Sequence, residues 1–278
     1  MAIKKKDKTT ATNDKTKSES KRTASRGLVK KRTLKVKKES SRKTSRKKKG
    51  RVDVLLEELL KAGCHFGHLV SKVNPRMQEY IFTARDGVHI FDLFKTKSQL
   101  EEAMNYLVKV TSSGGKIIFV GTKRQAIKAV KKAAQETGMF YVSTRWVGGL
   151  LTNWKEVKKN LERLEELKKK LSQKNTSLTK YELSVLRRER SRLESLYDGL
   201  GGLEELPDCL FIVDTKREQT AIREAKRMGI GLVGITDTNA DPREIDYVIP
   251  ANDDAQASVD YILGKVTEAI KQAKNDQE

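Results

Sequence analysis

The chain has 278 residues, and 58 Lys and Arg against 37 Asp and Glu give it a formal net charge of +21. No stretch approaches the roughly 18–20 apolar residues of a membrane span, and no apolar signal-peptide core is present near the N-terminus. We therefore expect neither a membrane-spanning nor a secreted protein. The two cysteines, Cys64 and Cys209, cannot form a four-thiolate zinc site and are expected to be reduced, buried thiols of a cytosolic protein.

The positive charge is concentrated in residues 1–51, which carry a net charge of +18 and almost no apolar residues. Such a segment cannot bury enough surface to offset the entropy cost of ordering it, so we expect it to be disordered in isolation. Polybasic arms bind polyanions through counterion release, without sequence preference. Nucleic acid is the favoured partner, while an anionic membrane surface and an organelle-targeting role stay open. Residues 52–278 carry a net charge of only +3, so a basic site there must be a local patch.

The folded part is expected to begin near Asp53, which can cap a helix that runs through residue 61 and ends at Gly63. The segment that follows contains His65 and His68. A pair of histidines can bind a metal, although a pair without a nearby Cys or acid is more often structural. A turn at 74–77 comes next, and 80–83 with 88–91 predicts a short β-hairpin.

From residue 96 onwards, strands and helices alternate. Three helices are expected to begin at capping boxes, in which a Thr is followed three residues later by a Gln or Glu. These boxes start at Thr96, Thr122 and Thr215. Apolar runs at 116–121, 140–142, 209–213, 230–236 and 247–249 predict the strands of a parallel sheet, and a last helix has its apolar side chains on one face.

Two long charged helices interrupt this alternation. Val157, Leu161, Leu164, Leu167 and Leu171 step by three or four residues, which is the spacing of a coiled-coil seam. After a polar turn at 172–177, a second helix repeats a similar spacing, with Arg190 interrupting it. We predict an antiparallel coiled-coil hairpin at 155–198, inserted into an α/β body of 52–154 and 199–278 that follows the basic extension 1–51.

The junction after the first strand of the sheet indicates an anion site. Lys123 and Arg124 are expected in a first helical turn, where the helix dipole disfavours cations unless an anion is bound. The spacing of a Walker A loop is missing. The alternative is two solvated charges. The anion site is preferred because the loop with Arg145 leaves the carboxyl end of the adjacent strand, where ligands of open α/β sheets gather.

Residues 145–154, Arg-Trp-Val-Gly-Gly-Leu-Leu-Thr-Asn-Trp, hold both tryptophans of the chain. The glycines allow a sharp bend or a close approach to another surface, and Arg145 offers a planar fork that suits phosphate or guanine. A buried turn with a tryptophan at each end explains the same pattern, with Trp154 as the leading candidate for a core residue.

Seven motifs, in this order along the chain, resemble those of bacterial-type small-subunit ribosomal protein S2, the uS2 family. They are Lys-Ala-Gly-Cys-His-Phe-Gly-His (61–68), Asn-Pro-Arg-Met (74–77), Phe-Val-Gly-Thr-Lys-Arg (119–124), the ten residues 145–154, Leu-Pro-Asp (206–208), Asp-Thr-Asn-Ala-Asp-Pro (237–242) and Ile-Pro-Ala-Asn-Asp-Asp (249–254). The resemblance covers about residues 53–272 and gives no account of 1–51.

The resemblance implies a three-layer α/β fold with an open parallel sheet, flavodoxin-like, and a protruding coiled-coil hairpin. It also implies a non-catalytic structural protein of the small ribosomal subunit. Such a protein sits between head and body on 16S-type rRNA, contacts neighbouring ribosomal proteins and helps to dock protein S1. We expect a cytoplasmic location, with no membrane, cofactor or small-molecule substrate. The expected rRNA-binding residues are Lys123, Arg124, Arg145, Trp146, Asn153, Arg76 and Asn74.

Two competing interpretations remain. In the first, an α/β enzyme binds a metal or nucleotide at the strand ends; no nucleophile–base motif or phosphate fingerprint supports it. A non-catalytic divalent ion is a milder version, with His68, Asp214 and Asp237 as candidate ligands, since these supply imidazole and carboxylate donors. In the second, the protein acts through its basic extension alone, on membranes or on nucleic acid in general.

Overall fold

The structure is a computed structural model that describes residues 55–172 and 179–276. The expected basic extension at 1–51 and the expected helix cap at Asp53 lie outside these residues. Residues from Leu55 onwards form one compact unit. It begins with a helix over 55–61, and Gly63 follows that helix with a positive φ of 73°.

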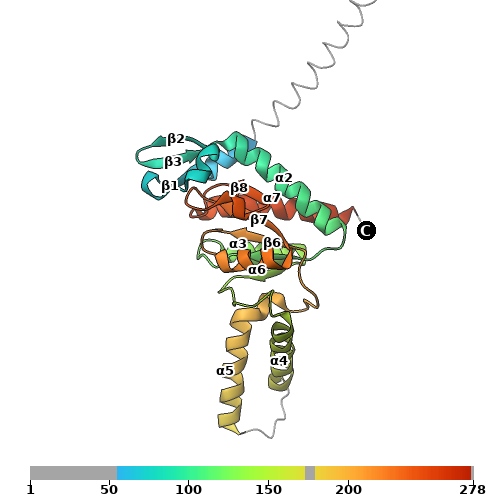
Figure 1. Cartoon of the computed structure of the whole chain (residues 1–278). Helices are drawn as coiled ribbons and strands as arrows, with labels where there is room; N and C mark the ends of the chain where they lie inside the picture. The colour runs from blue at the N-terminus through green and yellow to red at the C-terminus, as the bar shows by residue number, and fades with distance from the viewer. Residues whose placement is uncertain (1–54, 173–178, 277–278) are drawn as a thin grey trace, which may run out of the picture. The chain divides into compact units, whose positions relative to one another are not determined.

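A five-stranded parallel sheet lies at the centre of this unit (Figure 1). Its strands occur in the order β5-β4-β6-β7-β8, and every neighbouring pair is parallel. The four residues of β4 and the five of β6 are all buried, which explains their continuous apolar sequences. The strands are β4 (Ile117–Val120), β5 (Phe140–Val142), β6 (Cys209–Val213), β7 (Gly231–Thr236) and β8 (Tyr247–Pro250). The predicted parallel sheet is confirmed.

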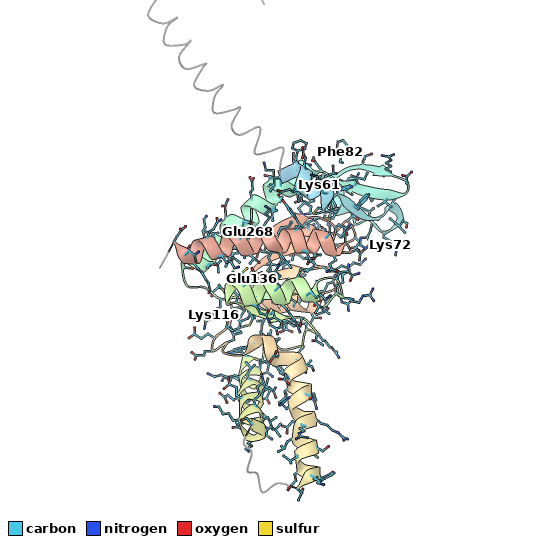
Figure 2. The ribbon with its side chains drawn as sticks, turned by 180° about the vertical axis from the view of Figure 1, so that it is seen from behind. Lys61, Lys72, Phe82, Lys116, Glu136 and Glu268 are labelled. Carbon is cyan, nitrogen blue, oxygen red and sulfur yellow. The ribbon has the colours of Figure 1, made fainter. Side chains whose placement is uncertain are left out.

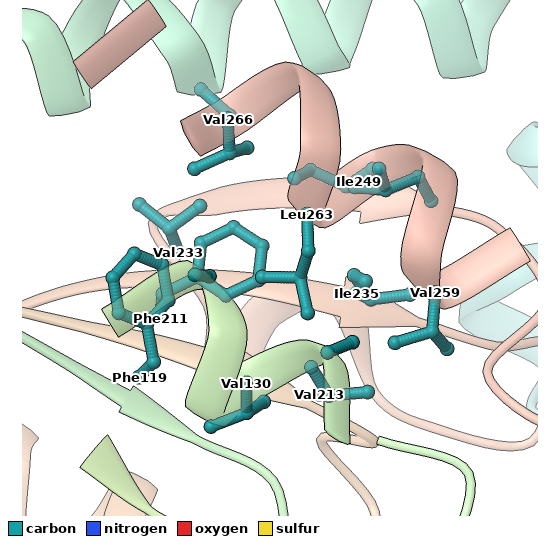
Figure 3. Packing of buried hydrophobic residues seen from close by; sticks show 14 of the residues in the cluster. Phe119, Val130, Phe211, Val213, Val233, Ile235, Ile249, Val259, Leu263 and Val266 are labelled. Atoms are coloured by element: carbon teal, nitrogen blue, oxygen red, sulfur yellow. The ribbon is translucent and has the colours of Figure 1, made fainter. Parts of the chain in front are cut away.

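Helices cover both faces of the sheet, so the α/β body has three layers. Successive strand residues point to opposite faces, and the buried residues divide accordingly into two clusters. The cluster with Phe119 and Phe211 packs under α2 (Leu93–Ser112), α3 (Ile127–Thr137) and α7 (Gln256–Asn275). Figure 3 shows this packing, with Leu263 and Val266 of α7 above the strands. The other cluster packs against α6 (Gln219–Met228) and the start of α4 (Trp154–Ser172).

A smaller antiparallel sheet precedes the body. Its strands β1 (Phe66–Leu69), β2 (Ile81–Arg85) and β3 (Val88–Phe91) occur in the order β1-β3-β2. The predicted hairpin is confirmed as β2 and β3, and its tight turn at 86–87 has φ of 54° and 77°. Strand β1 was not expected from the sequence. Phe82 on β2 is 75% exposed and points away from the core (Figure 2).

The predicted pair of long helices is confirmed as α4 (Trp154–Ser172) and α5 (Lys180–Tyr197), which lie side by side and extend away from the sheet (Figure 1). The turn between them falls largely outside the described residues. Arg163 of α4 pairs with Glu189 of α5, at 2.9 Å from Nε to Oε1. The seam residues of α4 that are buried are Val157, Leu161, Leu164 and Leu167.

The three expected capping boxes are wrong. Helix α2 begins earlier, with Asp92 as its cap, while α3 and α6 begin later, at Ile127 and Gln219. The threonine hydroxyls are used in contacts across the fold: Thr96 donates to the carbonyl of Pro250 at 2.7 Å. As a consequence, Lys123 and Arg124 lie in a turn before α3 and not in its first turn.

Short 3-10 helices complete the described part of the chain. They are η1 (Val70–Lys72), η2 (Pro75–Tyr80), η3 (Asp198–Leu200) and η4 (Pro242–Glu244).

Candidate nucleic-acid interface

The residues that follow the five parallel strands gather at one edge of the sheet, because all neighbouring strands are parallel. Ligands of open α/β sheets bind at this edge. The segments that leave the strands there are 121–126, 143–154, 214–218, 237–241 and 251–255. They hold most of the residues that the sequence singled out.

One carboxylate fixes the conformation of the loop 145–154. Glu224 of α6 is only 8% exposed and accepts hydrogen bonds from Nε1 of Trp146 at 3.2 Å and from the backbone amides of Gly149, Leu151 and Thr152 at 2.8, 3.0 and 3.4 Å. Burial by itself raises the pKa of Glu224, but these hydrogen bonds outweigh burial and lower the pKa below its ordinary value. The carboxylate is therefore ionised at neutral pH.

The loop 145–154 combines the two alternatives that the sequence left open, a buried turn and a surface that can bind a partner. Trp146 is buried and Trp154 is half-buried at the start of α4, so the tryptophans do contribute to the core. Gly149 has a φ of 89°, which requires glycine at this bend. Arg145 and Asn153 are nevertheless exposed. A rigid loop thus presents a guanidinium and an amide to solvent.

Arg145 lies beside a second arginine. An open pocket of about 420 Å³ is lined by Arg145, Arg217, Thr122, Thr144 and Thr220, with Trp146 and Glu218 also contributing. Arg145 and Arg217 are both exposed, and neither forms an ion pair with a described residue. Two arginines and three threonines therefore line one solvent-accessible pocket.

The acid at this pocket is satisfied within the fold. Glu218 is 3% exposed and accepts hydrogen bonds from the hydroxyl and the backbone amide of Thr122. Arg217 in turn donates from Nε to the hydroxyl of Thr122 at 2.9 Å. Burial raises the pKa of Glu218 above its ordinary value, although the bonds from Thr122 oppose that shift. The carboxylate of Glu218 is therefore buried and bonded to Thr122.

Lys123 points to a different group of residues. Its Nζ lies 2.7 Å from Oδ1 of Asp253, 2.5 Å from Oδ1 of Asp254 and 3.3 Å from Oδ2 of Asp214. The side chain of Lys123 is 13% exposed. Burial by itself lowers the pKa of Lys123, but these carboxylates, Asp253 first, raise it above its ordinary value. The structure thus places Lys123 among three carboxylates and separates it from Arg145.

His68 completes this cluster. Its Nδ1 lies 3.1 Å from Oδ1 of Asp237, and its Nε2 lies 3.3 Å from Oδ2 of Asp254. Ligand atoms of His68, Asp237, Asp253 and Asp254 all lie within 4.8 Å of one another, which is close enough to hold one cation. Two of the three expected metal ligands are therefore brought together, whereas Asp214 is not in this set and pairs with Lys123.

The charges of the cluster do not balance. Asp253 is 1% exposed, and burial, followed by the nearby charges of Asp214 and Asp237, raises its pKa above the usual range. The carboxylate of Asp237 accepts a hydrogen bond from His68 and thereby raises the pKa of His68. Carboxylates thus contribute to both shifts, and among the described residues Lys123 is the one lysine that forms ion pairs with this group.

The remaining candidates lie apart from the arginine pocket. The side chain of Asn74 caps η2 by accepting from the backbone amide of Arg76 at 3.0 Å, and the backbone amide of Asn74 donates to the carbonyl of Thr238 at 2.8 Å. The guanidinium of Arg76 is half exposed and pairs with Asp241. Arg124 is exposed. The structure therefore gives Asn74 a local structural role and leaves Arg76 partly engaged.

Several residues of this edge escaped sequence reasoning. Asp253 and Asp254 lie four and five residues after the predicted strand 247–249, so the rule that singled out Asp214 and Asp237 could have found them if it had been extended by a few residues. Arg217 and Glu224 carried no such signal, because each is an ordinary charged residue in or next to a helix. Their roles depend on the packing of α6 against the loop 145–154.

None of the helices in the described segments is long and apolar enough to cross a lipid bilayer. The family model described as Ribosomal protein S2 matches residues 59–273, which is most of the chain. The match includes the small antiparallel sheet, the parallel sheet and the α4–α5 pair. The chain therefore belongs to the ribosomal protein S2 family, whose members are non-catalytic proteins of the small ribosomal subunit.

Proposed function

We propose that this protein binds the rRNA of the small subunit through the carboxyl edge of its parallel sheet, with Arg145 and Arg217 as the principal phosphate contacts. The pocket that these two residues share carries the proposal. A guanidinium group binds phosphate oxygens through two parallel hydrogen bonds, and hydroxyl groups add further donors. Contacts of this kind position a protein on RNA through the sugar-phosphate backbone.

Glu224 supports this role because it holds the loop that carries Arg145. With its carboxylate inside the loop, four donors of the loop are satisfied without solvent. The loop therefore needs little reorganisation to bind RNA, which lowers the entropy cost of binding. Trp146 contributes by fixing this shape, and the exposed Asn153 supplies hydrogen-bonding groups next to the pocket.

The other residues that were expected to contact rRNA are proposed to have different roles. Arg124 is exposed and is proposed as an additional phosphate contact. Arg76 can contribute only in competition with Asp241, and Asn74 acts by shaping the turn that carries Arg76. Lys123 is proposed as an internal counter-ion for Asp253 and Asp254, since its ammonium group already lies among their carboxylates.

The wider setting follows from the family. We propose the head–body junction of the small subunit as the location, 16S-type rRNA and neighbouring ribosomal proteins, including S1, as partners, and the cytoplasm as the compartment. The basic extension 1–51 is proposed as an additional arm that binds rRNA through charge alone.

We also propose that the cluster of His68, Asp237, Asp253 and Asp254 binds a divalent cation with no catalytic role. Imidazole and carboxylate donors suit zinc. The crowding of carboxylates supports this proposal: burial and the nearby charges of Asp214 and Asp237 raise the pKa of Asp253 even with Lys123 beside it, and a cation would stabilise the charged form of Asp253. Asp214, which was expected to be a ligand, is not proposed as one because it pairs with Lys123.

The test uses small subunits that lack this protein, to which tagged full-length protein is added at increasing salt. The variant Arg145→Ala/Arg217→Ala is expected to bind about tenfold or more weakly, because it loses two phosphate contacts. Each lost contact should also reduce the slope of log affinity against log salt concentration by about one unit. The matched control is Lys109→Ala/Arg227→Ala, which removes two exposed charges from the last turns of α2 and α6. Equal affinity for the wild type and both variants would disprove the proposed interface.

A further inference from the structure

The pocket between Arg145 and Arg217 contains an acid that a phosphate ligand does not explain. Glu218 lines this pocket and is 3% exposed. An ionised carboxylate only accepts hydrogen bonds and repels a phosphate group, whereas the two arginines attract one. A ligand that suits the whole pocket therefore carries hydrogen-bond donors as well as acceptors.

One carboxylate oxygen of Glu218 is left for such a ligand. The backbone amide of Thr122, at 3.3 Å, and the hydroxyl of Thr122 both donate to Oε1. No described residue donates to Oε2, and this oxygen is not shut off from solvent. Burial raises the pKa of Glu218, so a further donor at Oε2 would stabilise the charged form of the acid.

The same threonine orients Arg217 beside this acid. Arg217 donates from Nε to the hydroxyl of Thr122 at 2.9 Å, and that hydroxyl donates to Glu218. The terminal nitrogens of Arg217 form no ion pair with a described residue, and the side chain is exposed. A guanidinium fork and a carboxylate oxygen are thus held on either side of one hydroxyl group.

This combination of donors and acceptor matches guanine among the bases. Guanine has two neighbouring acceptors, O6 and N7, to which one arginine donates two hydrogen bonds. Its N1–H and N2–H groups are donors that a carboxylate can accept. Adenine presents a donor, N6, where guanine presents the acceptor O6, so adenine cannot accept both bonds from an arginine fork.

The pocket has room for a base. Its volume of about 420 Å³ lies within the roughly 300–1,000 Å³ of pockets that hold small organic ligands. Trp146 lines the pocket with aromatic surface, and Thr144 and Thr220 line it with side chains that carry hydroxyl groups. Unpaired bases of RNA are bound in this way, by contact with aromatic rings and by hydrogen bonds to their edges.

We propose that this pocket binds an unpaired guanine of the rRNA, with Arg217 at O6 and N7 and Oε2 of Glu218 at N1–H or N2–H. Arg145 contacts the phosphate of the same nucleotide, and the remaining N–H donors of Arg217 can still reach a phosphate oxygen. The inference deepens the proposed function and rests on it, because it requires that the partner at the sheet edge is rRNA. It adds recognition of a base to phosphate contacts that do not depend on sequence.

Chemical footprinting of small subunits that lack this protein tests the contact at individual atoms of the base. Kethoxal modifies N1 and N2 of unpaired guanines, and dimethyl sulfate modifies guanine N7. Full-length wild-type protein is expected to protect one guanine from both reagents. The control is Glu268→Gln, at an exposed position of α7, which is expected to give the same protection.

Glu218→Gln is expected to restore the reaction of this guanine with kethoxal. The two donors of Thr122 require an oxygen at the position of Oε1, so the amide nitrogen takes the place of Oε2 and cannot accept a hydrogen bond. Binding to the subunit is expected to weaken about tenfold, as for one lost base contact. The salt slope is expected to stay unchanged, since no phosphate contact is lost.

Arg217→Lys is a second variant that does not disturb the buried acid. Arg217 is exposed, and lysine keeps the positive charge but cannot donate two parallel hydrogen bonds to O6 and N7. The guanine is therefore expected to become reactive to dimethyl sulfate at N7. Thermal unfolding and circular dichroism check that both variants are folded, and Arg217→Lys alone decides the test if Glu218→Gln is not.

The outcomes separate this inference from the proposed function. The guanine contact is overturned if no guanine is protected, if its protection is the same in wild type and variants, or if the protected base is an adenine or a cytosine. In these cases the phosphate interface still stands, provided that Arg145→Ala/Arg217→Ala weakens binding and lowers the salt slope. If that double variant binds like the wild type, the proposed interface itself fails.

Discussion

Glu224 binds the indole of Trp146 across the interface between α6 and the loop 145–154, at 3.2 Å from Nε1 to Oε1. The same carboxylate accepts from backbone amides of the loop. A single acidic side chain thus supplies hydrogen-bond acceptors to backbone amides that have no backbone partner in this irregular segment. The position of Arg145, next in sequence to Trp146, depends on this arrangement.

Replacing Glu224 by Gln is expected to destabilise the protein. The amide nitrogen that replaces one carboxylate oxygen cannot accept hydrogen bonds, so the loop donors that bond to that oxygen are left unsatisfied, at a cost of about 1–3 kcal/mol. Thermal unfolding is expected to show a Tm that is lower by roughly 2–4 °C for each kcal/mol lost from the free energy of unfolding. The control is Glu268→Gln, at an exposed position of α7 (Figure 2). A Tm equal to that of the control would show that Glu224 does not hold the loop.

The pKa of Glu224 also predicts a dependence of stability on pH. Its pKa is lower in the folded state than in the unfolded state, so the unfolded state takes up the proton first on acidification. The stabilisation is complete above the ordinary glutamate pKa of about 4.3 and is lost as the pH falls through the lower folded-state value. The difference in the free energy of unfolding between wild type and Glu224→Gln is therefore expected to shrink from pH 6 to pH 3. Urea unfolding at each pH measures it, and a difference that stays constant would contradict this assignment.

The sequence was sufficient to predict the layers of the fold. Runs such as 117–120 and 209–213 are apolar without interruption, as strands buried on both sides must be, and the leucine spacing after Trp154 predicted α4. The helix starts were predicted wrongly because Thr96, Thr122 and Thr215 match a local pattern while their side chains are buried or bonded elsewhere. Local propensity yields to tertiary contacts at such positions.

The candidate site was predictable only in part, for a similar reason. Rules about strand ends locate Arg145, Asp237 and Lys123 at one edge of the sheet, which the structure confirms. They do not say which cation meets which acid, because that depends on side chains that are distant in sequence. Lys123 and Asp253 are 130 residues apart.

Lys123→Met tests whether Lys123 is a counter-ion or an RNA contact. Removing the ammonium group leaves the buried carboxylate of Asp253 without its partner, which costs about 3 kcal/mol or more for a buried pair. We expect a clear fall in Tm, and no fall for the control Lys128→Met at an exposed position of α3. If Lys123→Met instead keeps its Tm and binds depleted small subunits more weakly, Lys123 is a phosphate contact as the sequence predicted.

Divalent cations are expected to stabilise the protein through the cluster that contains His68. Zinc added to chelator-treated protein should raise Tm, since a ligand that binds only the folded state adds about 2.7 kcal/mol at 100 times its Kd. His68→Ala should remove this response, whereas the control His65→Ala, whose side chain is not in the cluster, should retain it. Metal analysis of the purified protein gives an independent measurement. A wild-type protein whose Tm is unaffected by zinc, magnesium and chelator would exclude the site.

Deleting residues 1–51 tests the role of the basic extension. Because this segment carries most of the net charge, its loss should make binding to depleted small subunits less dependent on salt, by about 0.7–0.9 in slope for each phosphate contact removed. A Gly/Ser segment of equal length serves as the control for chain length. An unchanged slope would show that the extension makes no contribution to rRNA binding. If the truncated protein fails to join small subunits at any salt, the extension rather than the sheet edge dominates binding, and the interpretation that the protein acts through its basic arm gains support.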